Sequence, residues 1–224
     1  MSGMADITFA IGDVHGCLTK LEALVSRCRN YARGASCKFI LLGDYIDRGP
    51  DSRGVVALAR HMESHGQAIC LKGNHEAILL HVIDFPDDIM WWIDNGGGVT
   101  LESYGVASIG QLPPDDLDWM RNLPLFKDDG LRFFVHAGID PRLPFDHQKE
   151  RTMLWSREFF VFDPGRFIVH GHTPLRSRFP EVHPYRLNLD TGAVYGGPLS
   201  AAAFVSGNAT PIALIVGDNI IEEL

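Results

Sequence analysis

The chain has 224 residues, of which 46% are hydrophobic and 21% charged, and its formal net charge is −8 at pH 7. This composition is typical of a globular protein with enough apolar residues for a sizeable core. Without a Lys- or Arg-rich stripe the sequence argues against nucleic-acid binding, and without an 18-residue apolar run it argues against a transmembrane helix.

The N-terminal residues and the cysteines predict where the protein works. The start, MSGMADITFAIGD, has no basic segment followed by a long apolar stretch, so we expect no secretory signal. No C-x-x-C pair occurs, and each cysteine lies in or beside an apolar segment, which is typical of reduced thiols. These cysteines are Cys17, Cys28, Cys37 and Cys70. We therefore expect a cytoplasmic protein that has no membrane partner.

The first third of the chain alternates short apolar runs with segments of helical periodicity. Each apolar run ends at a glycine or beside one, and the helical segments carry apolar residues three and four positions apart. The expected elements are a strand at 7–11, a helix at 18–32, a strand at 37–42, a helix at 52–65 and a strand at 67–71. This β-α-β-α-β order predicts a mostly parallel sheet with helices on its faces.

The rest of the chain changes character twice. Residues 77–126 look mainly helical, with apolar-patterned pieces at 89–93 and 115–123 and a glycine-rich breaker at 95–100. A strand is expected at 131–135. The last quarter is rich in strands separated by Gly and Pro turns, which favours antiparallel pairing. These strands are expected at 166–169, 185–190, 199–205 and 211–216. One domain over 1–224, with the helical middle as a cap over one edge, is the simplest interpretation.

Polar clusters directly follow five of the expected strands. They read GDVHG (12–16), GDYIDRG (43–49), GNHE (73–76), HAG (136–138) and HGHT (170–173). Because the carboxyl ends of parallel strands line a common crevice, we expect these loops to meet at one edge. The side chains delivered there are Asp13, His15, Asp44, Asp47, Arg48, Asn74, His75, Glu76, His136, His170 and His172.

This set of donors predicts a metal centre. Carboxylate, amide and imidazole ligands suit first-row divalent metals, and a pair of ions about 3.5–4 Å apart needs a shared ligand. Asp44 is the natural bridge, because a carboxylate has two oxygens. One ion would take Asp13 and His15 as well. The other would take Asn74, His136 and His172.

Each cluster alone has an ordinary explanation, and Asn74 could simply cap a helix. The prediction therefore depends on all five clusters together. The other histidines have no such setting and are interpreted as solvated or structural: His61, His65, His81, His147 and His183. Two divalent ions would outweigh the two carboxylates, so the site would hold a phosphate dianion, and Arg48 would offer it a bidentate fork.

The motifs resemble those of the phosphoprotein phosphatases within the calcineurin-like metallophosphoesterases. The resemblance runs from about residue 6 to 216, and LWSRE (154–158) and LDTGAVYGG (189–197) look like the bacterial and phage branch of serine/threonine protein phosphatases. It implies an α/β fold with a central β-sandwich of mixed sheets flanked by helices and a small helical cap. Ala137 stands where the eukaryotic enzymes have a second glycine. This difference does not affect the expected ligand His136.

The resemblance also implies roles for individual residues. The two divalent ions, Mn first and Fe, Zn, Ni, Co or Mg as alternatives, would be held by Asp13, His15, Asp44, Asn74, His136 and His172, with His172 rather than His170 as the ligand from HGHT. His75 and Asp47 would be the catalytic pair. Arg48 and Arg157 would grip the phosphate of the substrate.

The expected reaction is hydrolysis of phosphoserine and phosphothreonine monoesters by a hydroxide that bridges the two metal ions, with His75 protonating the leaving oxygen. The partner would be a phosphorylated protein or a small phosphoester. The alternative is a symmetrical diadenosine tetraphosphate hydrolase with the same centre. A non-catalytic binding module is disfavoured because the full set of residues is present. Trp91, Trp92 and Trp119 could line a peptide groove or a base-stacking wall, but we expect them to be core.

Overall fold

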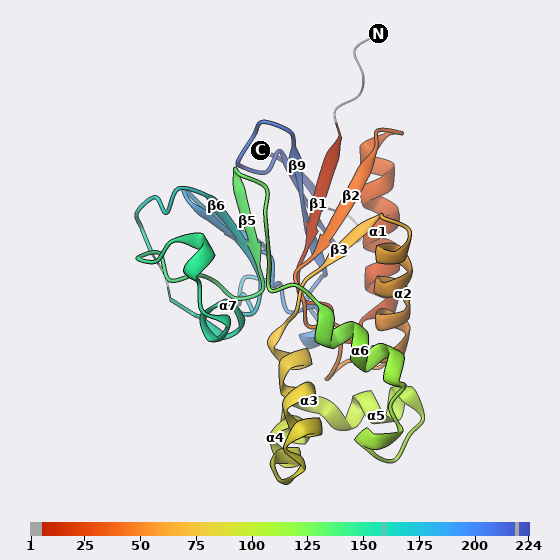
Figure 1. Ribbon diagram of the computed structural model, residues 1–224. Coiled ribbons are helices and arrows are strands. Elements are labelled where there is room, and N and C mark those ends of the chain that lie inside the picture. Colours follow the sequence, from red (N-terminus) through yellow and green to blue (C-terminus); the bar gives the residue numbers. More distant parts are fainter. Residues whose placement is uncertain (1–5, 159, 218–219) are drawn as a thin grey trace.

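Two β-sheets face each other across an apolar layer, and helices cover their outer sides (Figure 1). The computed structural model describes residues 6–158, 160–217 and 220–224. Each sheet contains parallel and antiparallel pairs. The predicted α/β fold with two mixed sheets is therefore confirmed.

The first sheet is built mainly from the β-α-β-α-β segment. Its strand order is β11-β10-β9-β1-β2-β3, and β1, β2 and β3 are parallel, as predicted. Strand β9 runs antiparallel to β1, and β10 runs antiparallel to β9 and β11. The bounds are Ile7–Ile11 (β1), Cys37–Leu41 (β2), Ala68–Cys70 (β3), Ser200–Val205 (β9), Ala213–Val216 (β10) and Ile220–Glu223 (β11).

The buried half of strand β1, Phe9 to Ile11, is apolar at every position because both of its faces are covered. Phe9 and Ile11 pack on the side covered by helices α1 (Leu18–Ala32) and α2 (Ser52–Ser64), while Ala10 lies in the layer between the sheets. Side chains alternate between the two faces of a strand, so a strand buried on both faces needs apolar residues at every position. Strand β1 ends at Ile11, and the first polar side chain after it is Asp13, which belongs to the candidate site.

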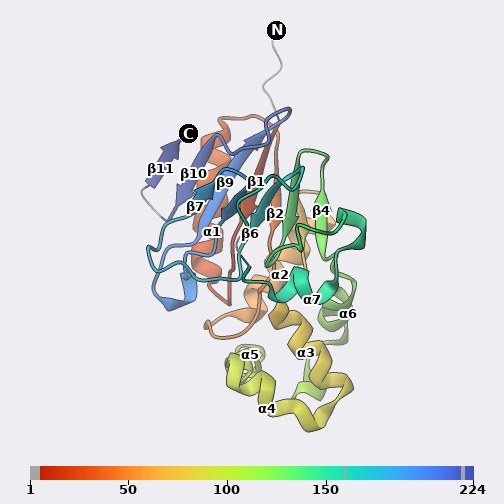
Figure 2. The same cartoon turned by 90° about the vertical axis from the view of Figure 1, so that its left-hand side faces the viewer.

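The second sheet has the order β4-β5-β6-β8-β7 and carries helix α7 (Glu150–Trp155) on its outer side (Figures 1 and 2). Strands β5, β6 and β8 are parallel, so the antiparallel pairing expected for 166–169 and 185–190 is wrong. The chain turns back in β7 before it enters β8, and this hairpin restores the direction of β6. The bounds are Phe126–Asp128 (β4), Arg132–Val135 (β5), Phe167–His170 (β6), Glu181–His183 (β7) and Arg186–Asn188 (β8).

A helical cap lies at one end of the two sheets, beyond the carboxyl ends of β1, β2 and β3 (Figures 1 and 2). It connects β3 to β4, as the sequence predicted for residues 77–126. Its helices are Asn74–Asp84 (α3), Ile89–Trp92 (α4), Gly98–Tyr104 (α5) and Pro114–Asn122 (α6). In the described residues, no helix is both long enough and apolar enough to cross a membrane.

The glycine-rich breaker expected at 95–100 is only partly correct. The chain continues through a wide helical turn, Ile93–Gly97, directly into α5, and within that turn Gly96 alone leaves helical geometry, with φ of 101°. The carbonyl of Gly96 accepts a hydrogen bond from the backbone N–H of Arg48, and a Cβ at this position would lie 2.8 Å from that nitrogen. This glycine therefore lets the cap approach the GDYIDRG loop.

Candidate metal centre

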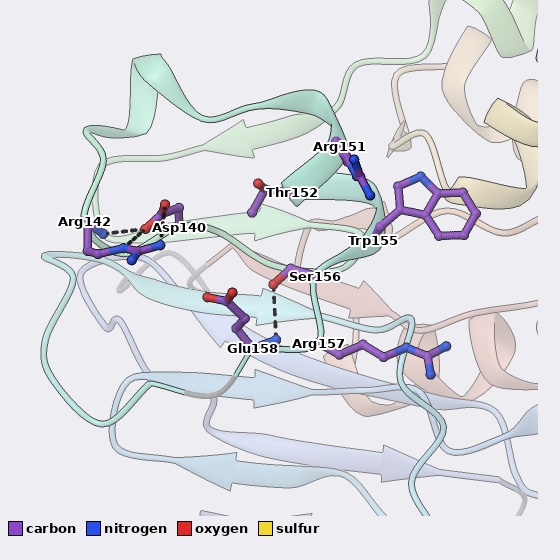
Figure 3. Close-up of a pocket in the computed structure, with 8 residues that line it drawn as sticks. All are labelled: Asp140, Arg142, Arg151, Thr152, Trp155, Ser156, Arg157 and Glu158. Carbon is purple, nitrogen blue, oxygen red and sulfur yellow. Dashed lines mark hydrogen bonds and ion pairs between the residues drawn. The ribbon is translucent and has the colours of Figure 1, made fainter.

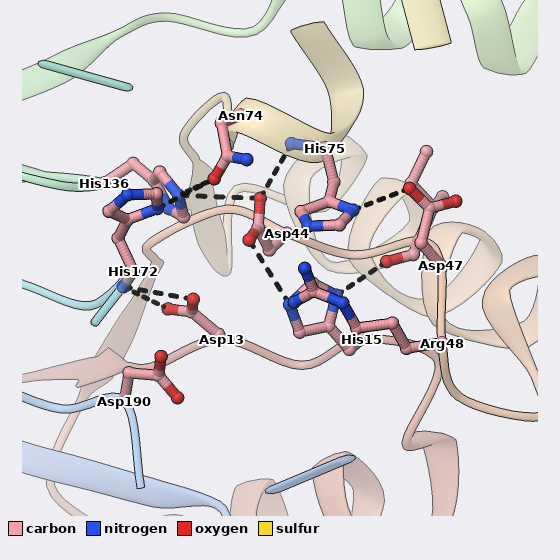
Figure 4. A network of polar contacts seen from close by, with 12 residues as sticks. Asp13, His15, Asp44, Asp47, Arg48, Asn74, His75, His136, His172 and Asp190 are labelled. Atoms are coloured by element: carbon pink, nitrogen blue, oxygen red, sulfur yellow. Dashed lines mark hydrogen bonds and ion pairs between the residues drawn. The ribbon is translucent and has the colours of Figure 1, made fainter. Parts of the chain in front are cut away.

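Five loops bring the six predicted metal ligands into one buried cluster at the carboxyl ends of the strands (Figure 4). None of these side chains is more than 7% exposed, although all are polar. Buried polar groups need partners, so each of these side chains should contact another polar group or an ion. The six residues are Asp13, His15, Asp44, Asn74, His136 and His172.

The loops that carry these residues contain unusual backbone angles. Of the seven non-glycine residues with positive φ in the described chain, five lie here. Each such conformation costs of the order of 1–3 kcal/mol and persists only where the surroundings enforce it. The five residues are His15, Asp44, Asp47, Arg48 and His172.

Glu76 supplies much of that enforcement. Its fully buried carboxylate accepts hydrogen bonds from the backbone N–H groups of Gly73 (2.9 Å), Asp44 (3.0 Å) and Tyr45 (2.8 Å). It thereby joins the GNHE loop to the GDYIDRG loop. The sequence predicted that Glu76 would reach this edge but gave it no role, and the structure places it behind the cluster as a backbone clamp.

Asp44 stands between two groups of ligands, as a bridging carboxylate would. One oxygen, Oδ2, lies 3.3 Å from Nε2 of His15, and the other, Oδ1, lies 3.5 Å from Nε2 of His136. Asp44 belongs to two groups of three residues, and within each group the ligand-type atoms all lie within 4.8 Å of one another. Asp13 falls in the set that contains His136, whereas the sequence grouped it with His15; the other set contains His75.

The imidazoles of His15 and His136 are oriented for metal binding. Nδ1 of each donates a hydrogen bond to a backbone carbonyl, of Ile46 and Leu42 respectively, both at 2.9 Å. A neutral ring bonded in this way carries its lone pair on Nε2, and here that lone pair faces Asp44. The two backbone carbonyls therefore hold both rings in the tautomer that a metal ligand needs, with the proton on Nδ1 and the lone pair on Nε2.

The contacts of Asn74 show whether a cation would fit among these side chains. Its Oδ1 lies 2.8 Å from Nε2 of His136 and 2.8 Å from Nδ1 of His172. Because Nε2 of His136 carries a lone pair, two electron-rich atoms face each other at close range, an arrangement that a cation between them would stabilise. Nε2 of His172 is also buried without a hydrogen-bond partner among the described residues. The donor set fits divalent metal ions.

The pKa values of the ligands are shifted by burial. Burial raises the pKa of Asp13 well above its usual value, and the nearby Asp190 and Asp44 raise it further. Burial lowers the pKa of His15 and of His172 to about 3, and it also lowers the pKa of His136. These three rings are thus neutral at pH 7, which is the form that binds metals.

His75 behaves differently from the other histidines of the cluster. Burial alone would lower the pKa of His75, but Asp44 and Asp47 outweigh it and raise that pKa above the usual value. Nδ1 of His75 lies 2.7 Å from Oδ2 of Asp47. The two carboxylates therefore favour the protonated form of the ring.

Asp47 is itself fixed by the helical cap. Its carboxylate accepts hydrogen bonds from Nε1 of Trp92 at 3.0 Å and from Oγ1 of Thr100 at 2.8 Å. Trp92 is fully buried, as expected for core, and its indole N–H has this specific partner. The cap thus orients the pair Asp47–His75 from behind.

The two arginines expected to bind phosphate differ in their surroundings. Arg48 donates from its guanidinium to Nε2 of His15 at 2.8 Å and lies over the ring of Tyr195, 5.8 Å from its centroid. That bond uses the lone pair which a metal at His15 would need, so metal binding there requires Arg48 to release it. Arg157 is exposed, after α7, and lies near enough to add to the lowering of the pKa of His172, which burial dominates.

The histidine of HGHT that was not chosen as a ligand lies apart from this network. His170 ends β6, is 5% exposed and donates from Nδ1 to the carbonyl of Gly171 at 3.1 Å. Its Nε2 receives a hydrogen bond from Arg186 at 3.2 Å, so its lone pair is used.

Sequence reasoning missed several neighbours of the cluster. Asp190 lies buried beside Asp13 (Figure 4), and the signal for it was its position directly after strand β8, like that of the other clusters. Trp155 lies with its ring centroid 6.1 Å from that of His172 and stacks on Trp91. Trp91 is 43% exposed, so the expectation that it is core is wrong, whereas Trp119 is half-buried and donates to Glu63.

The sequence is similar to those of known phosphoesterases. A family model described as calcineurin-like phosphoesterase matches residues 8–208. Serine/threonine-protein phosphatase 1 of Salmonella typhimurium is 32% identical over 207 residues, which cover 87% of this chain and 90% of that protein. The asymmetrical bis(5'-nucleosyl)-tetraphosphatase PrpE of Oceanobacillus iheyensis is 27% identical over 231 residues and 87% of each chain.

The fold also matches solved structures. The crystal structure of a candidate diadenosine tetraphosphatase superposes with a TM-score of 0.70 at 25% identity, over 96% of this chain and 95% of that one.

Proposed function

This chain belongs to the calcineurin-like phosphoesterase family, and we propose that it is a metal-dependent phosphatase of phosphoserine and phosphothreonine in proteins. The observation that carries the proposal is the cluster of six ligand-type side chains around Asp44, next to a His75–Asp47 pair. The choice of a protein substrate is supported by the similarity to a serine/threonine-protein phosphatase over 87% of the chain.

Two divalent ions would be held by the six ligands, with Asp44 shared between them. When bound, such ions lower the pKa of water from about 15.7 toward about 7 and neutralise charge on a phosphoryl group. The metal identity is part of the proposal, with Mn first and Fe, Zn, Ni, Co or Mg as alternatives. The three neutral histidines support borderline first-row metals over Mg, which prefers oxygen ligands.

His75 would act as the general acid. A serine or threonine oxygen is a poor leaving group, and a proton from Nε2 of His75 would let it depart, with an effect of about 10²–10⁴-fold. The bond from Nδ1 to Asp47 supports this role, because it raises the pKa of the ring and leaves Nε2 for the substrate. Trp92 and Thr100 would hold Asp47 still during the proton transfer.

Arg48 and Arg157 would bind the phosphate oxygens. A guanidinium offers two parallel N–H donors to such a group. Arg48 is half-buried at the mouth of the cluster, beside His15, so it would turn from that ring toward the substrate. Arg157 would approach from the side of α7.

A second candidate function is hydrolysis of dinucleoside polyphosphates. The stacked, partly exposed Trp91 and Trp155 favour it, because such rings could stack on a nucleobase, and so does the likeness to a tetraphosphatase. Symmetrical cleavage of diadenosine tetraphosphate would release two ADP, and asymmetrical cleavage would release ATP and AMP, so the products would identify the mode.

One assay tests both candidates. Metal-stripped protein is loaded with Mn, its metal content is measured, and a phosphopeptide panel is compared with diadenosine tetraphosphate by kcat/KM. We expect two ions per chain and a higher kcat/KM for the phosphopeptides. A strong preference for the dinucleotide would reverse the ranking, and protein that retains neither Mn nor any of the alternative metals would end the proposal.

We also propose that the protein works in the cytoplasm on phosphorylated proteins or small phosphoesters. Its four cysteines are free thiols, three of them buried, which supports a reducing compartment.

A further inference from the structure

A hollow of about 330 Å³ lies beside the candidate metal centre, along α7 and the residues that follow it (Figure 3). Trp155 lines the hollow, and its ring centroid lies 6.1 Å from that of His172, one of the predicted ligands. A phosphate bound at the metal ligands would not fill this space. Only a substrate that extends past Trp155 would reach it.

The hollow carries an excess of positive charge. Its lining includes three arginines and two acids, in a protein whose net charge is −8. Arg142 is already paired, with Nε 2.8 Å and NH2 3.0 Å from the two oxygens of Asp140. Within the described residues, no carboxylate lies at ion-pair distance from Arg151 or Arg157. Arg151 and Arg157 thus line this space, and neither has a carboxylate partner in the described part of the chain.

Arg151 occupies a special position between two hollows. Together with Trp91 and Trp155 it lines a second space of about 380 Å³, and it also lines the first. The two tryptophan rings stack at 6.0 Å and 21° and are 43% and 37% exposed. Because Arg151 and Trp155 line both spaces, a substrate that extends into either one would pass close to Arg151.

We propose that this region is a specificity subsite for a second anionic group of the substrate, with Arg151 as the cation that recognises it. The inference rests on the proposed phosphoesterase function, in which the first anionic group is the phosphate to be hydrolysed. The second group would be a carboxylate of an acidic residue near the phosphoresidue, or the next phosphate of a polyphosphate chain. Arg157 stands at the border and would serve the scissile phosphate.

The test compares substrates with and without the second anion. Para-nitrophenyl phosphate has none. A phosphoserine peptide with Glu residues beside the phosphoserine, its matched Gln version and diadenosine tetraphosphate complete the set. With Mn-loaded wild-type protein we expect the Glu peptide to have the lower KM of the two peptides. Arg151→Gln should raise KM for the Glu peptide by about fivefold, the upper range for a solvent-exposed charge pair, and leave kcat unchanged.

Matched variants separate recognition from general effects. Arg151→Gln should leave hydrolysis of para-nitrophenyl phosphate unaltered, and Arg151→Lys should keep part of the preference because it keeps the charge. Arg33→Gln removes an exposed arginine at the far end of α1 and should change none of these constants.

The outcomes are distinct. Equal KM values for the two peptides and no effect of Arg151→Gln on the dinucleotide would overturn the subsite. A fivefold effect on diadenosine tetraphosphate alone would support it and assign the second anion to a polyphosphate chain. If wild-type protein that has bound Mn hydrolyses none of these compounds, the proposed function itself fails.

Discussion

The glycines at the two ends of the first sheet meet different needs. At the end that carries the ligands, Gly73 has an ordinary φ of −96°, but a Cβ there would overlap Oδ1 and the backbone nitrogen of Asp44. At the opposite end, Gly66 has a φ of +66°, and a Cβ there would meet nothing within 4 Å. Gly73 is required for space, whereas Gly66 is required only for a backbone angle.

Backbone strain shows the same division. At the opposite end the left-handed turns after α1 and between β9 and β10 use Gly34 and Gly207, which adopt that conformation without a steric penalty. At the ligand end, Asp44 and His172 adopt it as non-glycine residues. Arg33, beside Gly34, also adopts it, so the opposite end is not free of strain, but five of the seven such residues in the described chain gather where side chains must converge. Changes at the ligand end should alter activity, and changes at the opposite end should alter stability alone.

The largest effect is expected from Asp44→Asn. It removes a carboxylate that lies within reach of both His15 and His136, so the affinity for Mn should fall by more than about 100-fold and activity with it. Elemental analysis after gel filtration would measure the bound metal, and circular dichroism would check the fold. A variant that retains two ions per chain would contradict the bridging role.

His75→Asn tests the acid at the same end. Turnover of phosphoserine peptides should fall by about 10²–10⁴-fold while metal content stays constant, because the ring is expected to supply a proton and not a ligand. Para-nitrophenyl phosphate should lose less, since its leaving group departs without a proton. Equal losses on both substrates would argue against the proton transfer.

Gly73→Ala and Gly66→Ala test the comparison most directly. Gly73→Ala should displace the Asp44 loop and lower both Mn affinity and kcat by at least about tenfold. This is the smallest loss that follows when a group that orients a metal ligand is removed. Gly66→Ala should cost about 1 kcal/mol of stability, from a left-handed alanine, and leave kcat/KM unchanged. Similar effects of the two substitutions on activity would refute the distinction between the ends.

Arg132→Met probes a contact at the opposite end. Arg132 is 6% exposed, pairs with Asp129 at 2.6 Å and donates to the carbonyls of Val205 and Asn208, so it joins the two sheets. Its loss should cost about 2 kcal/mol, a reduced value because Asp129 is partly exposed, and activity should not change. Urea unfolding at pH 7 would measure the loss.

The pH dependence of the same variant gives a second measurement. Burial would raise the pKa of Asp129, but its bonds to Arg132 outweigh burial and lower that pKa. The stabilisation is therefore present above the ordinary value of about 4 and is lost as the pH falls below it toward the lowered pKa. The difference in stability between wild type and Arg132→Met should shrink in that window, and a constant difference would exclude the ion pair as its source.

The sequence predicted the elements whose signals are local. The strand at 7–11 and the helix at 18–32 coincide with β1 and α1, because an apolar run ending at glycine and a clear helical period depend only on neighbouring residues. The short elements β4, β7, β11 and α7 were not predicted. Nor was the parallel pairing of β6 with β8, because pairing depends on the path of the chain between the strands.

The candidate site divides in the same way. Convergence of the five loops could be predicted because each polar cluster directly follows a strand. The bond from Arg48 to His15 and the stack of Trp91 on Trp155 could not, since each joins side chains from segments with no common motif. The roles of the site residues stay predictions that the variants above will test.

The anchoring of Asp47 by Trp92 and Thr100 has a consequence for engineering this enzyme. The helical cap between β3 and β4 is a module that could be exchanged with that of a relative to change which molecules are accepted. Because two donors from that module hold the partner of His75, a graft that lacks an indole and a hydroxyl at those points would bring a new specificity at the expense of turnover. Chimeras should therefore keep these two residues and vary the outer surface, where Phe85 and Met90 are exposed.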